Sequence, residues 1–303
     1  MKSNILLLIT AAIWGSAFVA QRVGMDYIGP FTYSGVRFLI GGVTLIPIAW
    51  WIRRWQARQV ASGKRRSRTP KEGGVGLLWA SLICGVVLFG GVTLQQIGMV
   101  YTTAGKGGFI TSLYIVLVPI MGLAFKQHVG AGVWIGALMA LVGLYLLSIK
   151  SDFTLDYGDL LMLIGAFFWA AHVLVLGWVA PKYDPVVLSI VQFLICGVLS
   201  MVCAFIFEVI VWADVMLAMD SILYAALMST GIAYTLQVVA QQDARPSHAA
   251  IILSSEAMFA VLAGWLILGE VLAIRGMWGC VLIMAGMLFS QLLPDLRLRS
   301  EAS

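Results

Sequence analysis

Residues 36–43 read VRFLIGGV, and residues 191–198 read VQFLICGV, 155 positions further along the chain. Six of these eight positions are identical, and no gap is needed to align them. The same shift places Trp14 on Trp169 and Pro30 on Pro185. An ungapped match of this kind indicates that one structural unit occurs twice in the chain.

The duplication continues through the rest of each half with a slightly smaller shift. A shift of 142 or 143 positions aligns Gln95 with Gln237, Ser112 with Ser254, Gly136 with Gly279 and Gly143 with Gly286. The shift falls because the first half contains a longer loop, residues 52–74. The sequence therefore predicts a first unit over residues 1–150, including this basic loop, and a second unit over residues 151–303.

The composition places most of this surface in lipid. Of the 303 residues, 61% are hydrophobic and only 11% are charged, whereas soluble domains carry about 25% charged residues. The mean hydropathy is +0.97. These values exclude an ordinary soluble enzyme, a disordered chain and a nucleic-acid-binding module. We expect membrane lipids and a small-molecule substrate as partners, and no nucleic acid.

Ten apolar segments are long enough to cross a bilayer, which takes about 20 residues per helix. They are residues 4–21, 30–51, 75–98, 103–125, 130–149, 158–178, 185–211, 217–240, 247–268 and 273–293. A membrane β-barrel would alternate apolar and polar residues, and runs such as 113–125 do not alternate. The sequence predicts an all-α integral membrane protein of ten transmembrane helices.

The distribution of basic residues predicts the orientation. With the N-terminus in the cytoplasm, 14 of the 19 Lys and Arg residues fall on the cytoplasmic side, as the positive-inside rule requires. Eight of them form a cluster over residues 53–71, which we expect to contact anionic lipids. We predict a multi-pass protein of the inner (plasma) membrane with both termini cytoplasmic.

Each predicted half has five spans, an odd number, so the second half enters the membrane from the opposite side. The result is a pair of inverted five-helix repeats. Inverted repeats are characteristic of alternating-access carriers, whose substrates bind near the midplane between the halves. A passive channel and a non-transporting membrane sensor are the alternative interpretations.

Several motifs resemble one known family. They are AIWGSAF at residues 12–18, Pro30 with Arg37-Phe38, YTTAGK at residues 101–106, SSEAMFA at residues 254–260 and LGE at residues 268–270. Together they are similar to the EamA family of the drug/metabolite transporter superfamily. Ala257 stands where that family often has proline, and Gln127 where it usually has glutamate. The resemblance implies ten helices and a secondary carrier, commonly an exporter of amino acids or other small metabolites.

Two charged residues lie within predicted spans. Glu256 is roughly 13 Å from the cytoplasmic end of its span, near the middle of a bilayer core about 30 Å thick. Charged groups at this depth face a bundle or a cavity. Glu256 could bind a substrate ammonium group or a coupling proton, or it could be a structural polar contact. We interpret Arg37 as structural, and the sequence leaves open whether the two residues pair.

The eighth span carries four polar residues on one helix face: Thr230, Tyr234, Gln237 and Gln241. This face either lines a cavity or makes hydrogen bonds between helices. Gln95 is the repeat mate of Gln237, which favours a two-fold polar cavity. Tyr114 is the repeat mate of Glu256, so the two halves differ at this position.

Lys106 and His248 are repeat mates near helix N-termini, where a cation could hold a substrate carboxylate or a lipid phosphate. Trp14 and Trp169 lie inside their spans and could wall an aromatic cavity or simply pack between helices. The predicted substrate-binding residues are Glu256, Gln237, Tyr234, Gln95, Trp14, Trp169, Tyr114, Lys106 and His248. The predicted structural polar residues are Arg37, Thr230 and His172.

We predict no enzyme activity, no cofactor and no metal site. The sequence has no GxxxxGK[ST] phosphate-binding loop and no HExxH motif. Its four cysteines lie in apolar runs without metal-ligand spacing. We expect the protein to be a monomer or a homodimer.

Overall fold

The structure is a computed structural model of the chain, and it describes residues 2–61, 75–102, 104–126, 129–148, 156–268 and 274–300. Most of the predicted basic loop, and the motif residues Gln127 and Glu270, lie outside these ranges. Over the described residues the fold is all-helical, with no strand. The predicted class, an all-α membrane protein, is confirmed.

The helices of the first half are α1 (Lys2–Gly24), α2 (Pro30–Ala61), α3 (Val75–Tyr101), α4 (Ala104–Ser112), α5 (Tyr114–Ala124) and α6 (Ala131–Ser148). Those of the second half are α7 (Tyr157–Val179), α8 (Pro185–Phe207), α9 (Trp212–Leu217), α10 (Met219–Tyr224), the π-helix η1 (Ala225–Tyr234), α11 (Thr235–Ala240), α12 (Pro246–Leu253), α13 (Glu256–Leu268) and α14 (Ile274–Ser300).

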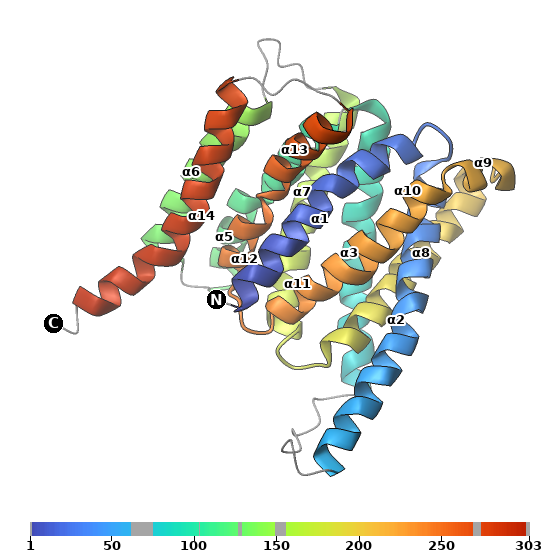
Figure 1. Cartoon of the computed structure of the whole chain (residues 1–303), viewed down its shortest axis with the longest axis horizontal. Helices are drawn as coiled ribbons and strands as arrows, with labels where there is room; N and C mark the ends of the chain where they lie inside the picture. Colours follow the sequence, from blue (N-terminus) through green and yellow to red (C-terminus); the bar gives the residue numbers. More distant parts are fainter. Residues whose placement is uncertain are drawn as a thin grey trace.

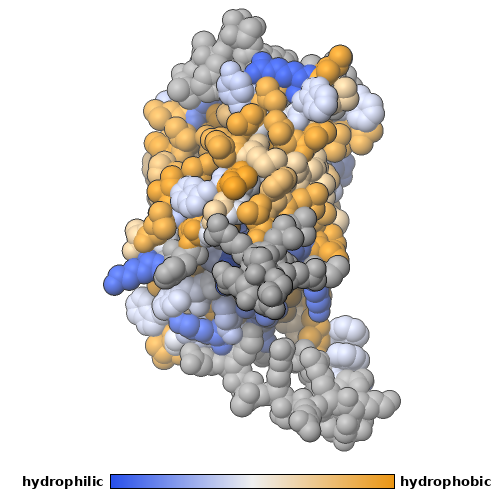
Figure 2. All heavy atoms as spheres, turned by 90° about the vertical axis from the view of Figure 1, so that its left-hand side faces the viewer, coloured by the Kyte–Doolittle hydropathy of each residue, from blue (hydrophilic) through white to orange (hydrophobic). Residues whose placement is uncertain are grey.

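Eight segments of the described chain are long and apolar enough to cross a membrane. Two further apolar stretches, Ala131–Leu146 in α6 and Ile274–Ser290 in α14, are shorter. Apolar side chains cover the middle of the face formed by these two helices, and hydrophilic side chains gather towards its ends (Figure 2). Leu138 of α6 and Trp278 of α14 are among the exposed large hydrophobic residues. Such a distribution fits a protein surrounded by hydrocarbon.

Small residues allow the helices to approach closely. Helices α6 and α14 stand side by side at one edge of the molecule and α2 and α8 at the other, while α1, α7 and α13 lie between them (Figure 1). In the α6–α14 pair, a Cβ atom on Gly143 would lie 2.6 Å from the carbonyl oxygen of Gly279. Backbone contact of this kind is common between membrane helices, where small residues permit close dispersion contacts.

Two predicted spans are interrupted near their middles. Helix α4 ends at Ser112 and α5 starts at Tyr114, while α12 ends at Leu253 and α13 starts at Glu256. At both breaks the backbone makes tighter hydrogen bonds three residues apart, such as Ser255 N to Ile252 O at 3.2 Å. The Ser254 and Ser255 hydroxyls also donate to carbonyl groups three residues back, a contact that bends helices.

We predict that Gly143→Ala destabilises the protein by about 1–3 kcal/mol, because the added methyl group forces two backbones apart. Thermal unfolding in detergent measures this loss. Gly105→Ala is the matched control, because nothing lies within 4 Å of its added Cβ atom. An equal effect of the two substitutions would contradict the close-contact interpretation.

Candidate functional site

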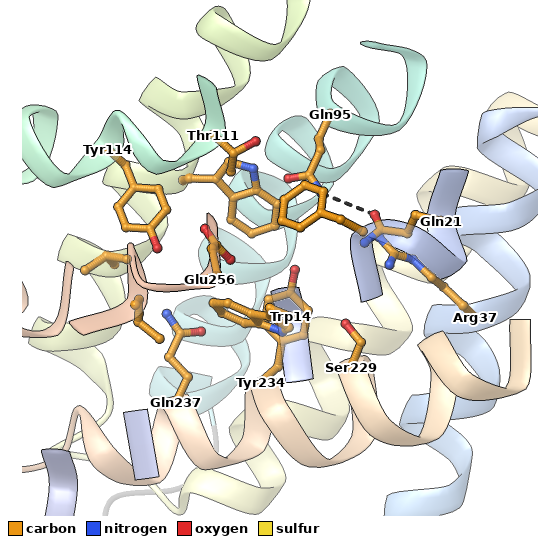
Figure 3. Close-up of a pocket in the computed structure, with 14 residues that line it drawn as sticks. Trp14, Gln21, Arg37, Gln95, Thr111, Tyr114, Ser229, Tyr234, Gln237 and Glu256 are labelled. Atoms are coloured by element: carbon orange, nitrogen blue, oxygen red, sulfur yellow. Dashed lines mark hydrogen bonds between the residues drawn. The ribbon is translucent and has the colours of Figure 1, made fainter. Parts of the chain in front are cut away.

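A small cavity lies between the helices of the two halves (Figure 3). Its volume is about 30 Å³, which is enough for about two water molecules. The lining residues are Trp14, Phe18, Gln21, Arg37, Gln95, Thr111, Tyr114, Trp169, Val173, Ser229, Tyr234, Gln237, Leu253 and Glu256. They come from α1, α2, α3, α4, α5, α7, η1, α11, α12 and α13.

Aromatic rings form one wall of this cavity around Tyr234. The ring centroid of Trp14 lies 4.6 Å from that of Tyr234, and the centroid of Trp169 lies 6.1 Å away in a stacked orientation. Phe38 and Phe193 each lie 5.8 Å from the same ring. These separations are in the range of favourable aromatic pairs. The wall is therefore an apolar surface that carries one phenolic hydroxyl.

Glu256 is another residue that lines the cavity. It is the first residue of α13 and is only 3% exposed. Its Oε1 atom has no hydrogen-bond partner in the protein, and the Tyr114 hydroxyl points towards its carboxyl group (Figure 3). Both side chains start a helix directly after a break. The breaks thus place a carboxyl group and a phenol at the same cavity wall.

Arg37 also reaches the cavity, beside Gln21 (Figure 3). It is 1% exposed, and its guanidinium carbon lies 4.9 Å from the centre of the Phe38 ring. No ion pair joins Arg37 to Glu256, both of which are described residues. Gln95 donates a hydrogen bond of 3.2 Å to Gln21, so two amides lie near the cation. The cavity therefore has a carboxyl group and a guanidinium that do not touch.

The structure brings together seven of the nine predicted substrate-binding residues: Glu256, Gln237, Tyr234, Gln95, Trp14, Trp169 and Tyr114. Their role in substrate binding stays a prediction. Lys106 and His248 do not line the cavity. Lys106 forms an ion pair with the buried Asp159, and Asp159 also accepts a hydrogen bond from Thr102. His248 is half-buried on α12.

Of the three residues predicted to be structural, Arg37 lines the cavity, whereas His172 and Thr230 do not, and neither does Gln241 of the eighth span. His172 lies 3.0 Å from the Gln192 amide oxygen and shares a buried hydrogen bond with it. Thr230 packs against Gly41 of α2. Gln241 donates to the Val173 carbonyl group at 2.8 Å. The predicted polar face of the eighth span is therefore divided, with Tyr234 and Gln237 at the cavity and the other two residues between helices.

The displacement of Thr230 from this face has a physical cause, because residues Ala225–Tyr234 form a π-helix. A π-helix has more residues per turn than an α-helix, so polar residues spaced for one α-helical face separate. Ser229 of this segment lines the cavity, and the α-helical pattern did not reveal it. Gln21 and Thr111 were also missed as lining residues. The signal for Gln21 was an amide at the end of a mostly apolar span.

The comparisons with known proteins agree with this architecture. A family model described as the EamA-like transporter family matches residues 1–149 and 156–292. An uncharacterized transporter of Archaeoglobus fulgidus is 31% identical over 96% of this chain and 86% of its own length. The uncharacterized transporter YwfM of Bacillus subtilis is 26% identical over 100% of this chain and 99% of its own.

A solved crystal structure superposes with a TM-score of 0.74 and covers 96% of each chain, at 19% identity. The shared fold, the apolar spans and the transporter relatives define a multi-pass membrane transport protein. More particularly, the chain belongs to the EamA-like transporter family. The family predicted from the sequence motifs is confirmed.

We predict that Tyr234→Ala lowers the free energy of unfolding by about 3–5 kcal/mol, because it leaves a void among four aromatic neighbours. Tyr234→Phe keeps the ring and should change stability by less than about 1.5 kcal/mol. Thermal unfolding of both variants in detergent tests this. A large loss in Tyr234→Phe would mean that the hydroxyl, rather than the ring, holds the wall together.

Proposed function

We propose that this protein is a secondary carrier that moves small metabolites across the cell membrane by alternating access between two inverted five-helix halves. The observation that carries the proposal is the central cavity, where a buried carboxyl group and an aromatic wall meet between the halves. A polar site enclosed by apolar helices near the repeat interface is the usual substrate site of such carriers. Small metabolites, amino acids among them, are the expected substrates.

The contacts of repeat mates support the inverted arrangement. A Cβ on Gly136 would meet Gly286, and a Cβ on Gly143 would meet Gly279. Under the repeat, Gly136 corresponds to Gly279 and Gly143 to Gly286. Exchanging every residue for its repeat mate therefore turns one of these contacts into the other. This exchange is expected for two units related by a two-fold axis. The register runs in opposite directions, so α6 and α14 are antiparallel.

The same crossed pattern recurs between α2 and α8. A Cβ on Gly42 would contact Leu194, and a Cβ on Gly197 would contact Leu39. These are again two pairs of mates exchanged across an axis. The two helix breaks are also mates, and the Ser112 hydroxyl lies 3.4 Å from the Ser254 carbonyl oxygen. Discontinuous helices meeting at the repeat interface are typical of secondary carriers.

A polar contact between the halves supports a closed state on the side predicted to be external. Lys106 of α4 pairs with Asp159 of α7, and Thr102 adds a hydrogen bond. The repeat mates of Lys106 and Asp159 are His248 and Asn4, and an asparagine cannot form an ion pair. This asymmetry favours closure by the ion pair on the external side.

The alternative, a passive channel, requires a continuous aqueous path. The cavity holds about two waters, which favours a carrier that opens to one side at a time. Electrical currents through the purified protein that are larger than the turnover of a carrier allows would favour a channel instead.

We predict that Glu256→Gln reduces transport at least about tenfold, because it removes the buried carboxyl group that would hold a cation or a proton. Proteoliposomes loaded with amino acids, sugars or nucleosides provide the flux measurement. Asp220→Asn is the matched control, because this exposed carboxylate lies outside the cavity. Normal flux in Glu256→Gln, with normal expression, would remove Glu256 from the site.

The inverted arrangement predicts that repeat mates in equivalent loops face opposite sides of the membrane. Asp26 and Pro181 are such mates, and both are exposed. In a variant without the four native cysteines, a membrane-impermeant maleimide should label Asp26→Cys in intact cells and Pro181→Cys only after the cells are opened. Labelling of both from the same side would rule out inverted repeats.

A further inference from the structure

Arg37 is a buried cation without an acidic partner in the described chain. Its side chain is 1% exposed, its Nε has no hydrogen-bond partner, and no carboxylate of a described residue lies within 4 Å. Arginine stays charged inside proteins, and burial of an unpaired charge is costly. Contacts with the Phe38 and Tyr33 rings offset only part of this cost.

The repeat shows that the scaffold does not need a charge at this position. The mate of Arg37 is Gln192, in the otherwise similar stretch of α8, and it is bonded to His172. The mate of Glu256 is likewise uncharged, since it is Tyr114. At these two positions each half thus carries an acidic or basic side chain that its partner half lacks. Both side chains line the same cavity, which favours a role in binding over a role in folding.

We propose that Arg37 forms an anion subsite that accepts the carboxylate group of the transported solute. The planar guanidinium matches a carboxylate with two parallel hydrogen bonds. Arg37 and Glu256 lie on different sides of the cavity (Figure 3), so a solute bound at Arg37 presents its other end to Glu256. A doubly charged phosphate would bring excess negative charge towards Glu256, whereas a singly charged carboxylate is balanced by one arginine.

This inference rests on the proposed function for its cargo, but it concerns binding and can be tested without transport. Thermal unfolding of the purified protein in detergent is measured with matched probes: leucine and leucinamide, and phenylalanine and phenylalaninamide. Each amide keeps the skeleton and the amine but removes the carboxylate charge. A ligand that binds the folded protein raises its apparent stability.

The acids are expected to stabilise the wild-type protein and the amides to do so much less. Arg37→Gln should weaken acid binding at least about tenfold and abolish the difference between acid and amide. Arg37→Lys should retain part of the difference between acid and amide. If Arg37→Gln fails to fold, Arg37→Lys takes its place in the experiment. Arg22→Gln is the control, because Arg22 pairs with Asp26 at the surface.

Three results would overturn the anion subsite: no stabilisation by any acid, equal stabilisation by acids and amides, or a preference for acids that survives Arg37→Gln. The carrier proposal fails separately. If acids bind through Arg37 but no flux is found in proteoliposomes, the subsite stands and the carrier does not. If Arg37→Gln carries acids as well as wild type, the carrier stands and the subsite does not.

Discussion

Hydrocarbon offers no hydrogen bonds, and this constraint governs the whole structure. Every backbone amide in the membrane must find its partner within the chain, so the spans are helical and irregular backbone is confined to protein-lined places. The two mid-span breaks obey this rule, because they meet each other at Ser112 and Ser254 beside the cavity rather than at the lipid surface. The polar residues Glu256 and Arg37 are excluded from lipid by the same constraint.

Much of the fold could be predicted because apolar spans and repeat mates leave clear signals in the sequence. The motif residues identified the family, and Trp14, Trp169 and Tyr234 were predicted to lie near one cavity, where the structure places them. The breaks were not predicted, since the mean hydropathy of the segments over residues 104–124 and 246–267 is high in spite of their polar residues. Hydropathy measures transfer to lipid and is blind to a single tightened turn within an apolar run.

The π-helix and the environment of Lys106 could not be predicted from the sequence, for a related reason. Helical-face arguments assume 3.6 residues per turn, and the extra residue per turn over Ala225–Tyr234 moves Thr230 away from Tyr234. Lys106 was predicted from its position at a helix N-terminus, but the long-range contact with Asp159 is made by a different helix. Such contacts depend on how the halves pack, and a single sequence does not specify that.

On the proposed arrangement of two repeats, a duplicated scaffold with unequal polar residues reconciles symmetry with selectivity. The crossed glycine contacts need close complementarity and are therefore kept in both halves. On the proposed function, the cavity has the opposite requirement, because a small solute with two different ends is not symmetric. Arg37 has Gln192 as its repeat mate, and Glu256 has Tyr114. Because neither pair of mates is identical, the cavity has two chemically distinct sides. On the proposed carrier mechanism, the symmetric contacts provide two similar conformations, and the asymmetric charges determine what is carried between them.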